Sequence, residues 1–319
     1  MRIHLAAACR WADAIVLGDQ GSTDATRRIA AEFGEQVRVV NNPGTDYNEG
    51  ERQRVVFDEA RRLFPGEPRI LMAIDADEAF SANYLESQEW DDIKRLPAGS
   101  GIYAEWVNFN PDFSTWFPFG GPFLIGVVDD GKIGHSSGKY HIPRLLQSPG
   151  SPRYICKEMK ILHYQYTDAD RSESKNRSYQ VQEWIDNPKR PIRLFRRFNA
   201  SLTKSFQFRS PINPAWVEGF ADERIRWDQI EIDGIYRWDR EVLDAILKFG
   251  AAFFRRLDIW DVDWGQVAQV HGVSASRQQL RDPRNGLEKR VHHWLRSSQP
   301  RMHRWDVRIC QWLLRLNGW

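Results

Sequence analysis

Two aspartates that stand two positions apart, Asp75 and Asp77, follow directly on the apolar segment 69–74. Carboxylates this close repel each other, and each raises the pKa of the other unless a cation neutralises them. A hard divalent cation such as Mg²⁺ binds one or two carboxylates together with the phosphate oxygens of a substrate, and it then acts as a Lewis acid on a leaving diphosphate. The pair therefore indicates a site for a metal-bound phosphate compound. The alternative is an acidic turn that caps a helix at Ser81.

The same Asp-x-Asp spacing occurs twice more in the chain, at 168–170 and at 261–263. Such a short pattern therefore has little specificity by itself. The two other pairs stand in polar or Trp-rich surroundings, which favours chance or the capping of helices. Segment 69–74 alone is too continuously apolar to have a solvated face, so only Asp75 and Asp77 are expected at the end of a buried strand.

The first hundred residues alternate between strands and helices. Apolar segments predict strands and amphipathic segments predict helices, in the order 14–19 (strand), 23–33 (helix), 37–40 (strand), 51–64 (helix) and 69–74 (strand). Strands that alternate with helices form right-handed crossovers and a parallel sheet, and ligands bind beyond the carboxyl ends of its strands. Asp19 ends the first predicted strand, so we expect it at the same cleft as Asp75.

Residues 13–26, Asp-Ala-Ile-Val-Leu-Gly-Asp-Gln-Gly-Ser-Thr-Asp-Ala-Thr, resemble the opening of family-2 glycosyltransferases, in which a strand runs into an Asp-Asp-x-Ser-x-Asp-x-Thr turn. Segment 74–78, Ile-Asp-Ala-Asp-Glu, resembles the metal-binding strand end of the same family. The resemblance covers residues 11–85. It implies an α/β fold of the GT-A type, a three-layer α/β/α sandwich with a mainly parallel central sheet. It also implies inverting, metal-dependent transfer of a sugar from a nucleoside diphosphate to a hydroxyl group.

The resemblance also implies roles for single residues. Asp19 would contact the nucleotide base, Asp75 would face the ribose and the metal, and Asp77 would bind the metal, which would be Mn²⁺ or Mg²⁺. Arg52 and Arg54 stand at the start of the second predicted helix. They could contact the base or the diphosphate, or they could belong to a solvated helix face.

The chain departs from the family pattern in two ways. Gln20 replaces the second acid of the family's turn, a tolerable change because the first acid usually contacts the base. The family also has a strand before this point, which forms the nucleotide cradle. We expect either that an N-terminal segment is missing from this chain or that residues 3–8 are the remnant of the helix that followed this strand.

An inverting transfer needs a base that takes the proton of the acceptor hydroxyl, on the side opposite to the leaving diphosphate. The candidate carboxylates are Glu105, in a predicted strand over 102–109, Asp129 and Asp130, in a loop, and Glu158. A Gly- and Pro-rich segment precedes Asp129 and Asp130, which favours these two because functional loops are often built in this way. A solvated turn acid is the alternative for each candidate.

Ring side chains offer further contacts. His163 lies in a predicted strand over 161–164 and could bind the metal or the diphosphate, or it could be a buried core histidine. Aromatic residues crowd segment 111–123, where they could stack on sugar rings or form a hydrophobic cluster. The 14 Trp residues suit ring stacking and core packing alike.

The composition limits the class of protein. With 41% apolar and 28% charged residues the chain is typical of a globular protein, and a net charge of +2 gives no reason to expect a nucleic acid partner. The three cysteines are far apart, which fits a reducing compartment better than a zinc site or a disulfide framework. No stretch approaches the ~18 apolar residues of a membrane span. We therefore expect a cytoplasmic protein.

We expect a GT-A domain over 1–235, with a nucleotide-sugar half over 1–100 and an acceptor half over 101–235, and a helical, basic, Trp-rich extension over 236–319. Residues 276–319 contain ten Lys or Arg and three Asp or Glu, a local charge of +7. One face of the last predicted helix carries large apolar residues with arginines beside them: Trp305, Ile309, Trp312, Leu313 and Leu316, flanked by Arg304, Arg308 and Arg315. Such a helix suits packing against the catalytic domain. It also suits an anionic membrane surface, so the alternative is contact of residues 300–319 with the inner face of the plasma membrane.

The expected partners are a UDP-, GDP- or dTDP-sugar donor and a glycan or lipid-linked acceptor, as in the synthesis of cell envelope polysaccharides. One rival function is a sugar-nucleotide pyrophosphorylase on a similar fold, which would need a Gly-rich phosphate loop with Arg and Lys near the first strand, and the sequence contains no such loop. The other rival is a non-catalytic nucleotide-binding or assembly protein. The Arg- and Trp-rich tail by itself would also suit a nucleic acid, but no such partner is expected.

Overall fold

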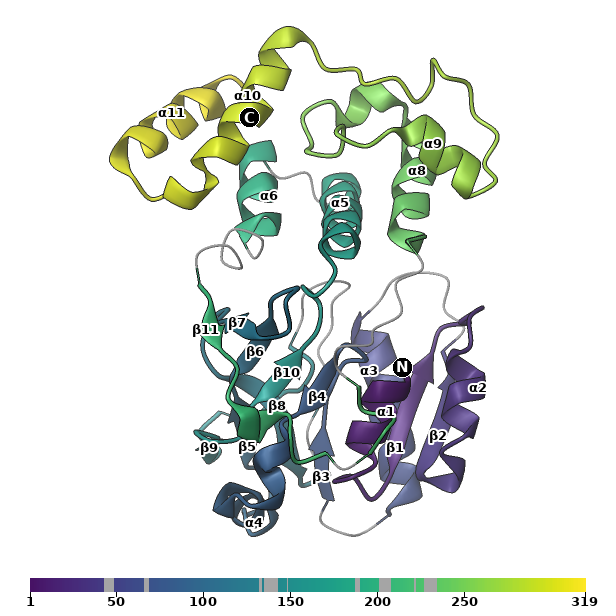
Figure 1. The fold of residues 1–319 in the computed structure, drawn as a ribbon, viewed down its shortest axis with the longest axis vertical. Coiled ribbons are helices and arrows are strands. Elements are labelled where there is room, and N and C mark those ends of the chain that lie inside the picture. Colours follow the sequence, from purple (N-terminus) through teal and green to yellow (C-terminus); the bar gives the residue numbers. More distant parts are fainter. Residues whose placement is uncertain are drawn as a thin grey trace. The chain divides into compact units, whose positions relative to one another are not determined.

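The computed structural model describes residues 1–42, 49–65, 69–131, 134, 143–147, 149–186, 190–200, 208–220, 222–226 and 234–319 (Figure 1). Contacts divide the chain into compact units. The first comprises Met1–Gln165 and Ser210–Ile230, and the second comprises Tyr166–Arg209 and Glu231–Trp319. Residues 166–209, which the sequence analysis placed in the acceptor half of the first domain, therefore group with the C-terminal helices.

An N-terminal group of helices and parallel strands opens the first unit. It consists of α1 (Arg2–Ala8), β1 (Ile15–Asp19), α2 (Thr26–Ala31), the 3₁₀ turn η1 (Gly34–Gln36), β2 (Val37–Asn41) and α3 (Glu49–Leu63). β1 and β2 pair in parallel, and Leu5, Ala30 and Val37 form an apolar cluster between them and the helices (Figure 1). α3 packs so closely on β1 that a Cβ atom on Gly18 would lie 2.8 Å from Cγ1 of Val56. The strands and helices predicted for this part of the chain are confirmed.

Mixed sheets form the remainder of the first unit. Their strands are β3 (Arg69–Met72), β4 (Glu78–Phe80), β5 (Gly101–Ala104), β6 (Trp106–Phe109), β7 (Thr115–Phe117), β8 (Phe123–Asp129), β9 (Arg153–Ile155), β10 (Ile161–His163) and β11 (Ser210–Pro211). One sheet has the order β3–β8–β5–β9, and another has the order β11–β7–β6–β10–β4. β5 pairs with β9 and β6 with β10 in parallel, whereas the other neighbours in these sheets are antiparallel.

The expectation of a mainly parallel central sheet is wrong. β1 and β2 are parallel, as the order strand–helix–strand predicts, but β3 belongs to another sheet and pairs antiparallel with β8. Because β8 comes much later in the chain, the local alternation of strands and helices could not reveal this partner. Asp19, at the end of β1, and Asp75, beyond the end of β3, therefore follow strands of different sheets.

The predicted strand over 102–109 is divided at Glu105 into β5 and β6, which belong to different sheets. The carbonyl of Glu105 accepts a hydrogen bond from the N–H of Ile161 (3.0 Å). Its carboxylate lies 3.0 Å from Nζ of Lys160. Glu105 therefore marks the point at which the chain crosses from one sheet to the other.

Aromatic side chains fill part of the core of the first unit. Phe80 lies with its ring centroid 5.7 Å from Trp11, 6.4 Å from Tyr84 and 5.7 Å from Trp90. The short helices around this core are η2 (Ala82–Leu85), α4 (Gln88–Lys94) and η3 (Pro214–Trp216). Trp11 and Trp90 thus serve core packing, the plainer of the two roles that the sequence allows for Trp.

Helices make up the second unit over its described residues. They are α5 (Ala169–Asp186), α6 (Pro191–Phe198), α8 (Arg237–Phe249), η4 (Ala251–Phe254), α9 (Trp264–Val270), α10 (Gly286–Ser298), η5 (Gln299–Arg301) and α11 (Trp305–Leu316). Val181 of α5, Leu194 of α6 and Leu243 of α8 belong to one buried apolar cluster, which explains why 166–209 group with the C-terminal helices. None of the described helices has the length and apolar character needed to cross a membrane.

The two other Asp-x-Asp pairs lie at helix starts in the second unit. Asp168 precedes α5, and its Oδ1 accepts a hydrogen bond from the N–H of Arg171 (3.1 Å). Oδ1 of Asp263 accepts from the N–H groups of Gly265 (2.9 Å) and Gln266 (3.2 Å) at the start of α9. One acid of each pair thus caps a helix start, which is one of the two alternatives, chance or helix capping, that the sequence allows.

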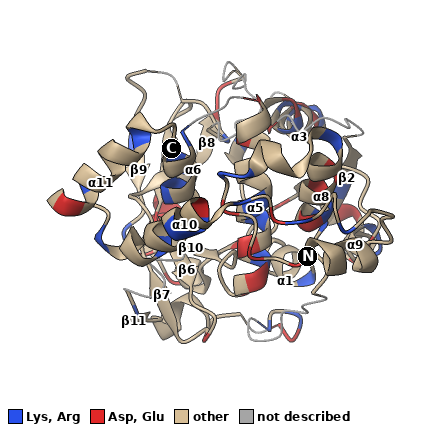
Figure 2. Ribbon diagram, turned by 90° about the horizontal axis from the view of Figure 1, so that it is seen from above, with Lys and Arg blue, Asp and Glu red and all other residues tan. Residues whose placement is uncertain are grey.

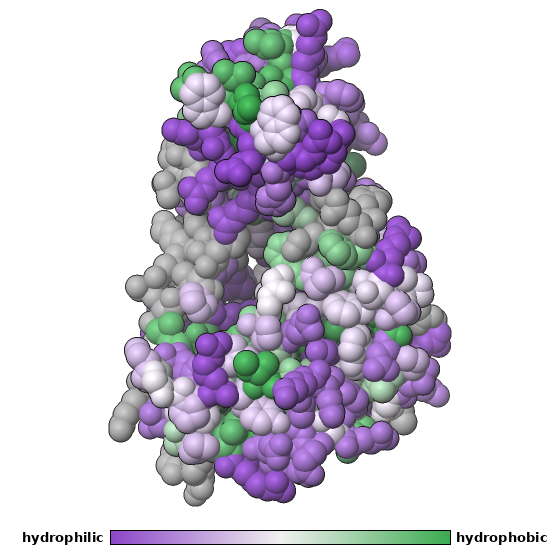
Figure 3. Space-filling view, turned by 90° about the vertical axis from the view of Figure 1, so that its left-hand side faces the viewer, coloured by the Kyte–Doolittle hydropathy of each residue, from purple (hydrophilic) through white to green (hydrophobic). Residues whose placement is uncertain are grey.

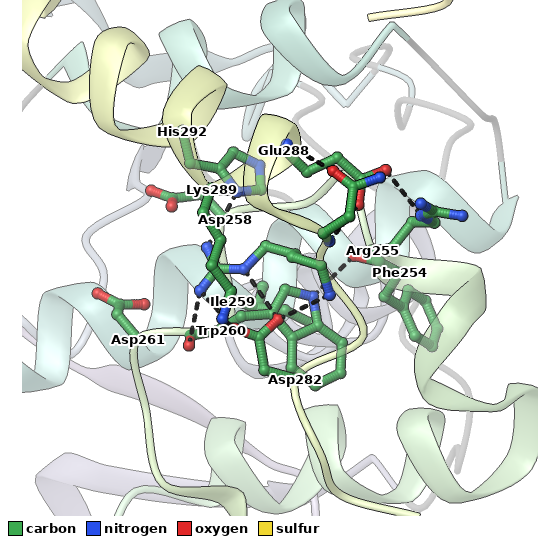
Figure 4. A network of polar contacts seen from close by, with 12 residues as sticks. Phe254, Arg255, Asp258, Ile259, Trp260, Asp261, Asp282, Glu288, Lys289 and His292 are labelled. Carbon is green, nitrogen blue, oxygen red and sulfur yellow. Dashed lines mark hydrogen bonds and ion pairs between the residues drawn. The ribbon is translucent and has the colours of Figure 1, made fainter.

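A network of arginines and acids ties α10 to the segment between η4 and α9 (Figure 4). Arg284 donates to the carboxylate of Asp282 (3.0 Å) and to the carbonyl of Trp260 (3.0 Å). Arg296 donates to the buried carboxylate of Asp258 (2.6 Å). These charge-assisted hydrogen bonds fix α10, which carries the chain on to α11.

Candidate functional site

A tight turn joins β3 to β4 and carries the predicted metal-binding carboxylates. The N–H of Glu78 donates to the carbonyl of Asp75 (2.9 Å), and the N–H of Asp75 donates to the carboxylate of Glu78 (3.0 Å). The N–H of Tyr164, just beyond β10, donates to the carbonyl of Asp77 (2.8 Å). Since β3 and β4 belong to different sheets, this acidic turn, residues 75–78, lies where the chain passes from one sheet to the other.

Glu78 is the buried member of the acidic turn, with 1% of its surface exposed. Its carboxylate accepts hydrogen bonds from Nη1 (2.6 Å) and Nη2 (2.8 Å) of Arg144 and from the indole N–H of Trp106 (2.8 Å). Burial favours the protonated acid, but the Arg144 guanidinium outweighs it and lowers the pKa of Glu78. Glu78 is therefore an ionised, buried group that holds the turn in place.

Arg144 is the cation of this cluster. Its Nη2 also donates to the carboxylate of Asp75 (2.6 Å), and its guanidinium lies 5.7 Å from the ring of Trp106 and 5.8 Å from the ring of Phe123. Burial by itself would lower the pKa of Arg144, but Glu78 and Asp75 raise it above its ordinary value. Neighbouring acids need a cation that neutralises them. The guanidinium of Arg144 does so for Glu78 and Asp75.

Buried polar side chains form a row across β4, β10 and β6. Glu78 stands opposite His163, and His163 stands opposite Asn108. Nδ1 of His163 lies 2.7 Å from Oδ1 of Asn108, whose amide nitrogen donates to the carbonyl of Phe117 (3.0 Å). This second bond fixes the amide, so Nδ1 of His163 carries the proton and a metal could reach the ring only through Nε2. The ring also stacks on Trp106 at 5.3 Å, which agrees with the buried-core alternative for His163.

Asp75 and Asp77 are the exposed and half-buried acids of the acidic turn. The side chain of Asp75 is 59% exposed, and Asp77 is half-buried. Asp77 is close enough to interact electrostatically with both Glu78 and Arg144. Three carboxylates and the guanidinium of Arg144 thus lie close together in this turn, and two of the carboxylates are at least partly exposed.

The donor atoms of the turn fit a weakly held divalent cation. Mg²⁺ and Mn²⁺ prefer oxygen ligands, and Mg²⁺ needs only one or two carboxylates beside substrate phosphates. Asp75 and Asp77 supply such carboxylates, but Arg144 already competes for Asp75. In the part of the chain that the structure describes, no group of three or more His, Cys, Asp or Glu side chains is arranged to hold a metal. The phosphate oxygens of a substrate would add ligands to a metal bound by these two carboxylates.

Asp19, the predicted contact of the nucleotide base, ends β1 and has 3% of its surface exposed. Its carboxylate accepts hydrogen bonds from the N–H groups of Gly21 (3.2 Å) and Ser22 (3.1 Å) and from Nε of Arg27 (2.7 Å). Burial raises the pKa of Asp19, but these hydrogen bonds outweigh it and lower the pKa. Gly21 permits the turn because its φ of +88° suits a residue without a side chain. Asp19 thus holds the turn from β1 to α2, and its contact with a base stays a prediction.

α3 braces the segment that carries Arg144. The side-chain amide of Gln53, in the orientation that satisfies both of its ends, donates to the carbonyl of Arg144 (3.0 Å). Arg54 instead pairs with Glu51 of the same helix (2.5 Å), as expected for a residue on a solvated helix face. Arg52 is half-buried near the start of α3, and its proposed contact with the diphosphate stays a prediction.

Asp129 and Asp130 lie at the opposite end of the sheet from the acidic turn. β8 runs antiparallel to β3, so Asp129 stands opposite Arg69 at the start of β3, whereas the turn follows Met72 at its end. Along the strand this separation is about 10 Å or more. The sequence favoured these two acids because a Gly- and Pro-rich segment precedes them, and this local feature does not show at which end of β3 they lie.

The surroundings of Asp129 also argue against a proton acceptor. Its buried carboxylate lies 2.9 Å from Nη2 of Arg61 and 3.1 Å from Nε of Arg69. Burial raises the pKa of Asp129, but the hydrogen bonds from Arg61 and the charge of both arginines outweigh it and lower the pKa. An acid paired with two guanidinium groups is a structural ion pair and a weak base.

Glu158 lies three residues before β10, whereas His163 ends that strand. Its exposed carboxylate accepts a hydrogen bond from Oγ of Ser87 (2.8 Å), and its N–H donates to the carboxylate of Glu89 (3.1 Å). Glu158 therefore joins its loop to α4. It lies before the start of β10, whereas His163 lies at the end of this strand. Glu158 is therefore a poor candidate for the catalytic base.

Sequence reasoning missed Arg144, Trp106 and Asn108. Arg144 stands 66 positions after Glu78, in a segment without helical or strand periodicity. The only available signal was the requirement that an acid in a buried turn find a cation, which does not say which cation it will be. Trp106 and Asn108 fell in the single strand predicted over 102–109. Because this strand is divided at Glu105, they belong to β6, which lies in a different sheet from β5.

Comparison with known proteins leaves this geometry to be interpreted by itself. No family model matches the chain, and no curated protein matches it. The similarity to family-2 glycosyltransferases therefore rests on residues 13–26 and 74–78.

Proposed function

We propose that the chain is a glycosyltransferase of the GT-A type, which transfers a sugar from a nucleoside diphosphate to a hydroxyl group of a glycan or lipid-linked acceptor. The observation that carries the proposal is the acidic turn beyond β3, where Glu78 and Arg144 hold the backbone that carries an exposed and a half-buried aspartate, Asp75 and Asp77. The motif similarity of residues 13–26 and 74–78 supports the same function. The fold would be a GT-A variant in which mixed sheets replace the usual parallel one.

Asp75 and Asp77 are the residues that would hold Mn²⁺ or Mg²⁺ together with the donor diphosphate. The ion would supply Lewis-acid stabilisation of the leaving group. The role of the other residues is to fix these two carboxylates in advance. Glu78 and Arg144 lock the backbone of the turn, and the aromatic ring of Trp106 supports both of them.

The donor would be a UDP-, GDP- or dTDP-sugar, with Asp19 and Arg52 on the nucleotide side, and the transfer would invert the anomeric centre. Asp129 and Glu158 are engaged in structural contacts, so we propose that neither of them is the base. Such a donor is made in the cytoplasm, and we propose that the protein works there or at the inner face of the plasma membrane.

Thermal unfolding in the presence of UDP, GDP and dTDP, each with and without Mn²⁺, tests the donor site. A ligand at a hundredfold excess over its Kd stabilises the native state by about 2.7 kcal/mol. We expect one nucleotide to raise Tm in the presence of metal, and we expect Asp77→Ala to abolish the shift. Asp170→Ala is the matched control, because Asp170 is the second acid of another Asp-x-Asp pair and is exposed in the first turn of α5. A folded wild-type protein that responds to no nucleotide would overturn the proposal.

Incubation with the corresponding nucleotide-sugar separates the rival functions. A glycosyltransferase releases the nucleoside diphosphate. The release is slow when the sugar is transferred to water and faster when an acceptor is present. A pyrophosphorylase releases nucleoside triphosphate and only when pyrophosphate is added. A non-catalytic binding protein is stabilised by the nucleotide-sugar and leaves it intact. Release that requires metal and is lost in Asp77→Ala is the expected result.

A further inference from the structure

The outer face of α11 leaves large apolar side chains in water. The exposed fractions are 74% for Trp305, 50% for Ile309, 57% for Trp312, 49% for Leu313 and 66% for Leu316. At about 100° of rotation per residue, these positions fall within an arc of about 100° on the helix. Figure 3, which faces the side on which α11 lies in Figure 1, shows hydrophobic side chains gathered next to hydrophilic ones near the top. Globular proteins rarely expose so many large apolar side chains in one patch.

A different face of α11 packs the helix into the second unit. Val307 and Gln311 are buried, and Leu314 packs against a cluster that includes Leu295 of α10 and the C-terminal residue Trp319. On a helical wheel these three positions of α11 lie opposite the outer face. The outer face is therefore a second apolar surface on a helix that is already docked.

Arginines border the outer face of α11. Arg308 and Arg315 follow one edge of the apolar arc, and Arg304 directly precedes the helix. Asp306, the only acid in residues 301–319, is paired with Arg304 (3.0 Å). Figure 2 marks the basic residues of α10 and α11 in blue. The surroundings of the apolar face are thus positively charged.

We propose that the outer face of α11 docks on the surface of an anionic lipid bilayer. Trp and Leu side chains would enter the boundary between headgroups and acyl chains, with the helix parallel to the membrane, and the bordering arginines would contact lipid phosphates. Trp suits this depth because its ring is apolar and its N–H is polar. A second copy of the chain fits the face less well, since two copies would bring their arginine edges together. The proposal does not depend on the reaction proposed above.

Sedimentation of the full chain with vesicles tests this docking. We expect binding to equimolar phosphatidylcholine and phosphatidylglycerol and little binding to phosphatidylcholine alone. Binding should weaken when salt rises from about 0.1 M to about 1 M, because the Debye length falls from about 10 Å to about 3 Å. Equal binding to both kinds of vesicle, or none to either, would overturn the proposal.

Paired variants assign the binding to α11. The apolar variant Trp305→Ser/Trp312→Ser and the charge variant Arg308→Glu/Arg315→Glu should each lower the partition coefficient on anionic vesicles by about tenfold or more. Circular dichroism checks that both remain folded.

The matched controls stand elsewhere on the surface. Leu85→Ser removes an apolar side chain that is 56% exposed, and Arg28→Glu/Arg95→Glu makes the same change in net charge on side chains that are 72% and 69% exposed. Both should bind vesicles like the wild type. α11 variants that bind like the controls would refute the docking face. Dimerisation of the wild type that is lost in Trp305→Ser/Trp312→Ser would instead make this face an interface between copies and would also refute it.

Discussion

The acids at the two ends of β3 differ in how far they are buried. At the start of the strand, the buried carboxylate of Asp129 lies between Arg61 and Arg69. Beyond its other end, Glu78 and Asp75 share the guanidinium of Arg144, and the side chain of Asp75 is 59% exposed. A buried acid is enclosed by two arginines at one end, whereas two of the acids at the other end are at least partly exposed.

This difference separates a structural ion pair from a candidate ligand site. Charges buried with their partners fix the geometry of the fold but leave no demand for a further ion. Two aspartates two positions apart, Asp75 exposed and Asp77 half-buried, supply oxygen ligands of the kind that a divalent cation prefers. Of the two acidic positions that the sequence proposed for chemistry along this strand, we propose the turn 75–78 as the ligand site.

Replacement of Arg144 should have the largest effect on stability. Arg144→Met leaves the buried carboxylate of Glu78 without its cation, so we expect the free energy of unfolding to fall by about 3–5 kcal/mol. The double variant Glu78→Gln/Arg144→Met should recover part of this loss, because it removes both charges. Urea unfolding measures both. A loss below about 1 kcal/mol in the single variant would show that the guanidinium does not hold the turn.

Asp129→Asn tests the buried acid at the start of β3. We expect a loss of about 1–3 kcal/mol in urea unfolding, because two arginines lose the charge that they share. The response of Tm to nucleotide and metal should be unchanged. Loss of that response in a folded variant would make this end part of the ligand site and remove the contrast between the two ends.

The pH dependence of stability follows from the same ion pairs. The pKa of Asp129 is lowered in the folded protein, so its contribution is fully present above the ordinary Asp value of about 4 and is lost as pH falls through the lowered folded value. The difference in unfolding free energy between wild type and Asp129→Asn should therefore be constant at neutral pH and narrow below about pH 4. Urea titrations at a series of pH values measure it. A difference that stays constant down to about pH 2 would assign the loss to packing and not to charge.

Asp77→Asn should have the smallest effect on stability. It removes one of several like charges, so we expect a change within about 1 kcal/mol in either direction. The nucleotide-dependent shift in Tm should nevertheless disappear. A large destabilisation would show that Asp77 is a structural residue like Asp129.

The sequence predicted the elements around the site better than their arrangement. β1, β2 and α3 follow from local periodicity and turn residues, and the roles of Asp168 and Asp263 as helix caps follow from local chemistry. The antiparallel pairing of β3 with β8 depends on distant residues, and no local pattern determines it.

The candidate site depends on the same long-range pairing. The sequence favoured Asp129 from the Gly- and Pro-rich segment before it, which does not show how far it lies from Asp75. The antiparallel ladder places Asp75 and Asp129 at opposite ends of β3. Arg144 was missed for a related reason, because its contact with Glu78 joins segments that no periodicity connects.

Binding of Mn²⁺ measured by electron paramagnetic resonance, with and without the nucleotide that raises Tm most, tests the central claim most directly. The account predicts weak binding of Mn²⁺ alone and tight binding together with the nucleotide in wild type and in Asp129→Asn. It predicts loss of the tight binding in Asp77→Asn. Tight binding that survives in Asp77→Asn, or that is lost in a folded Asp129→Asn, would contradict the assignment of the ligand site to the turn 75–78.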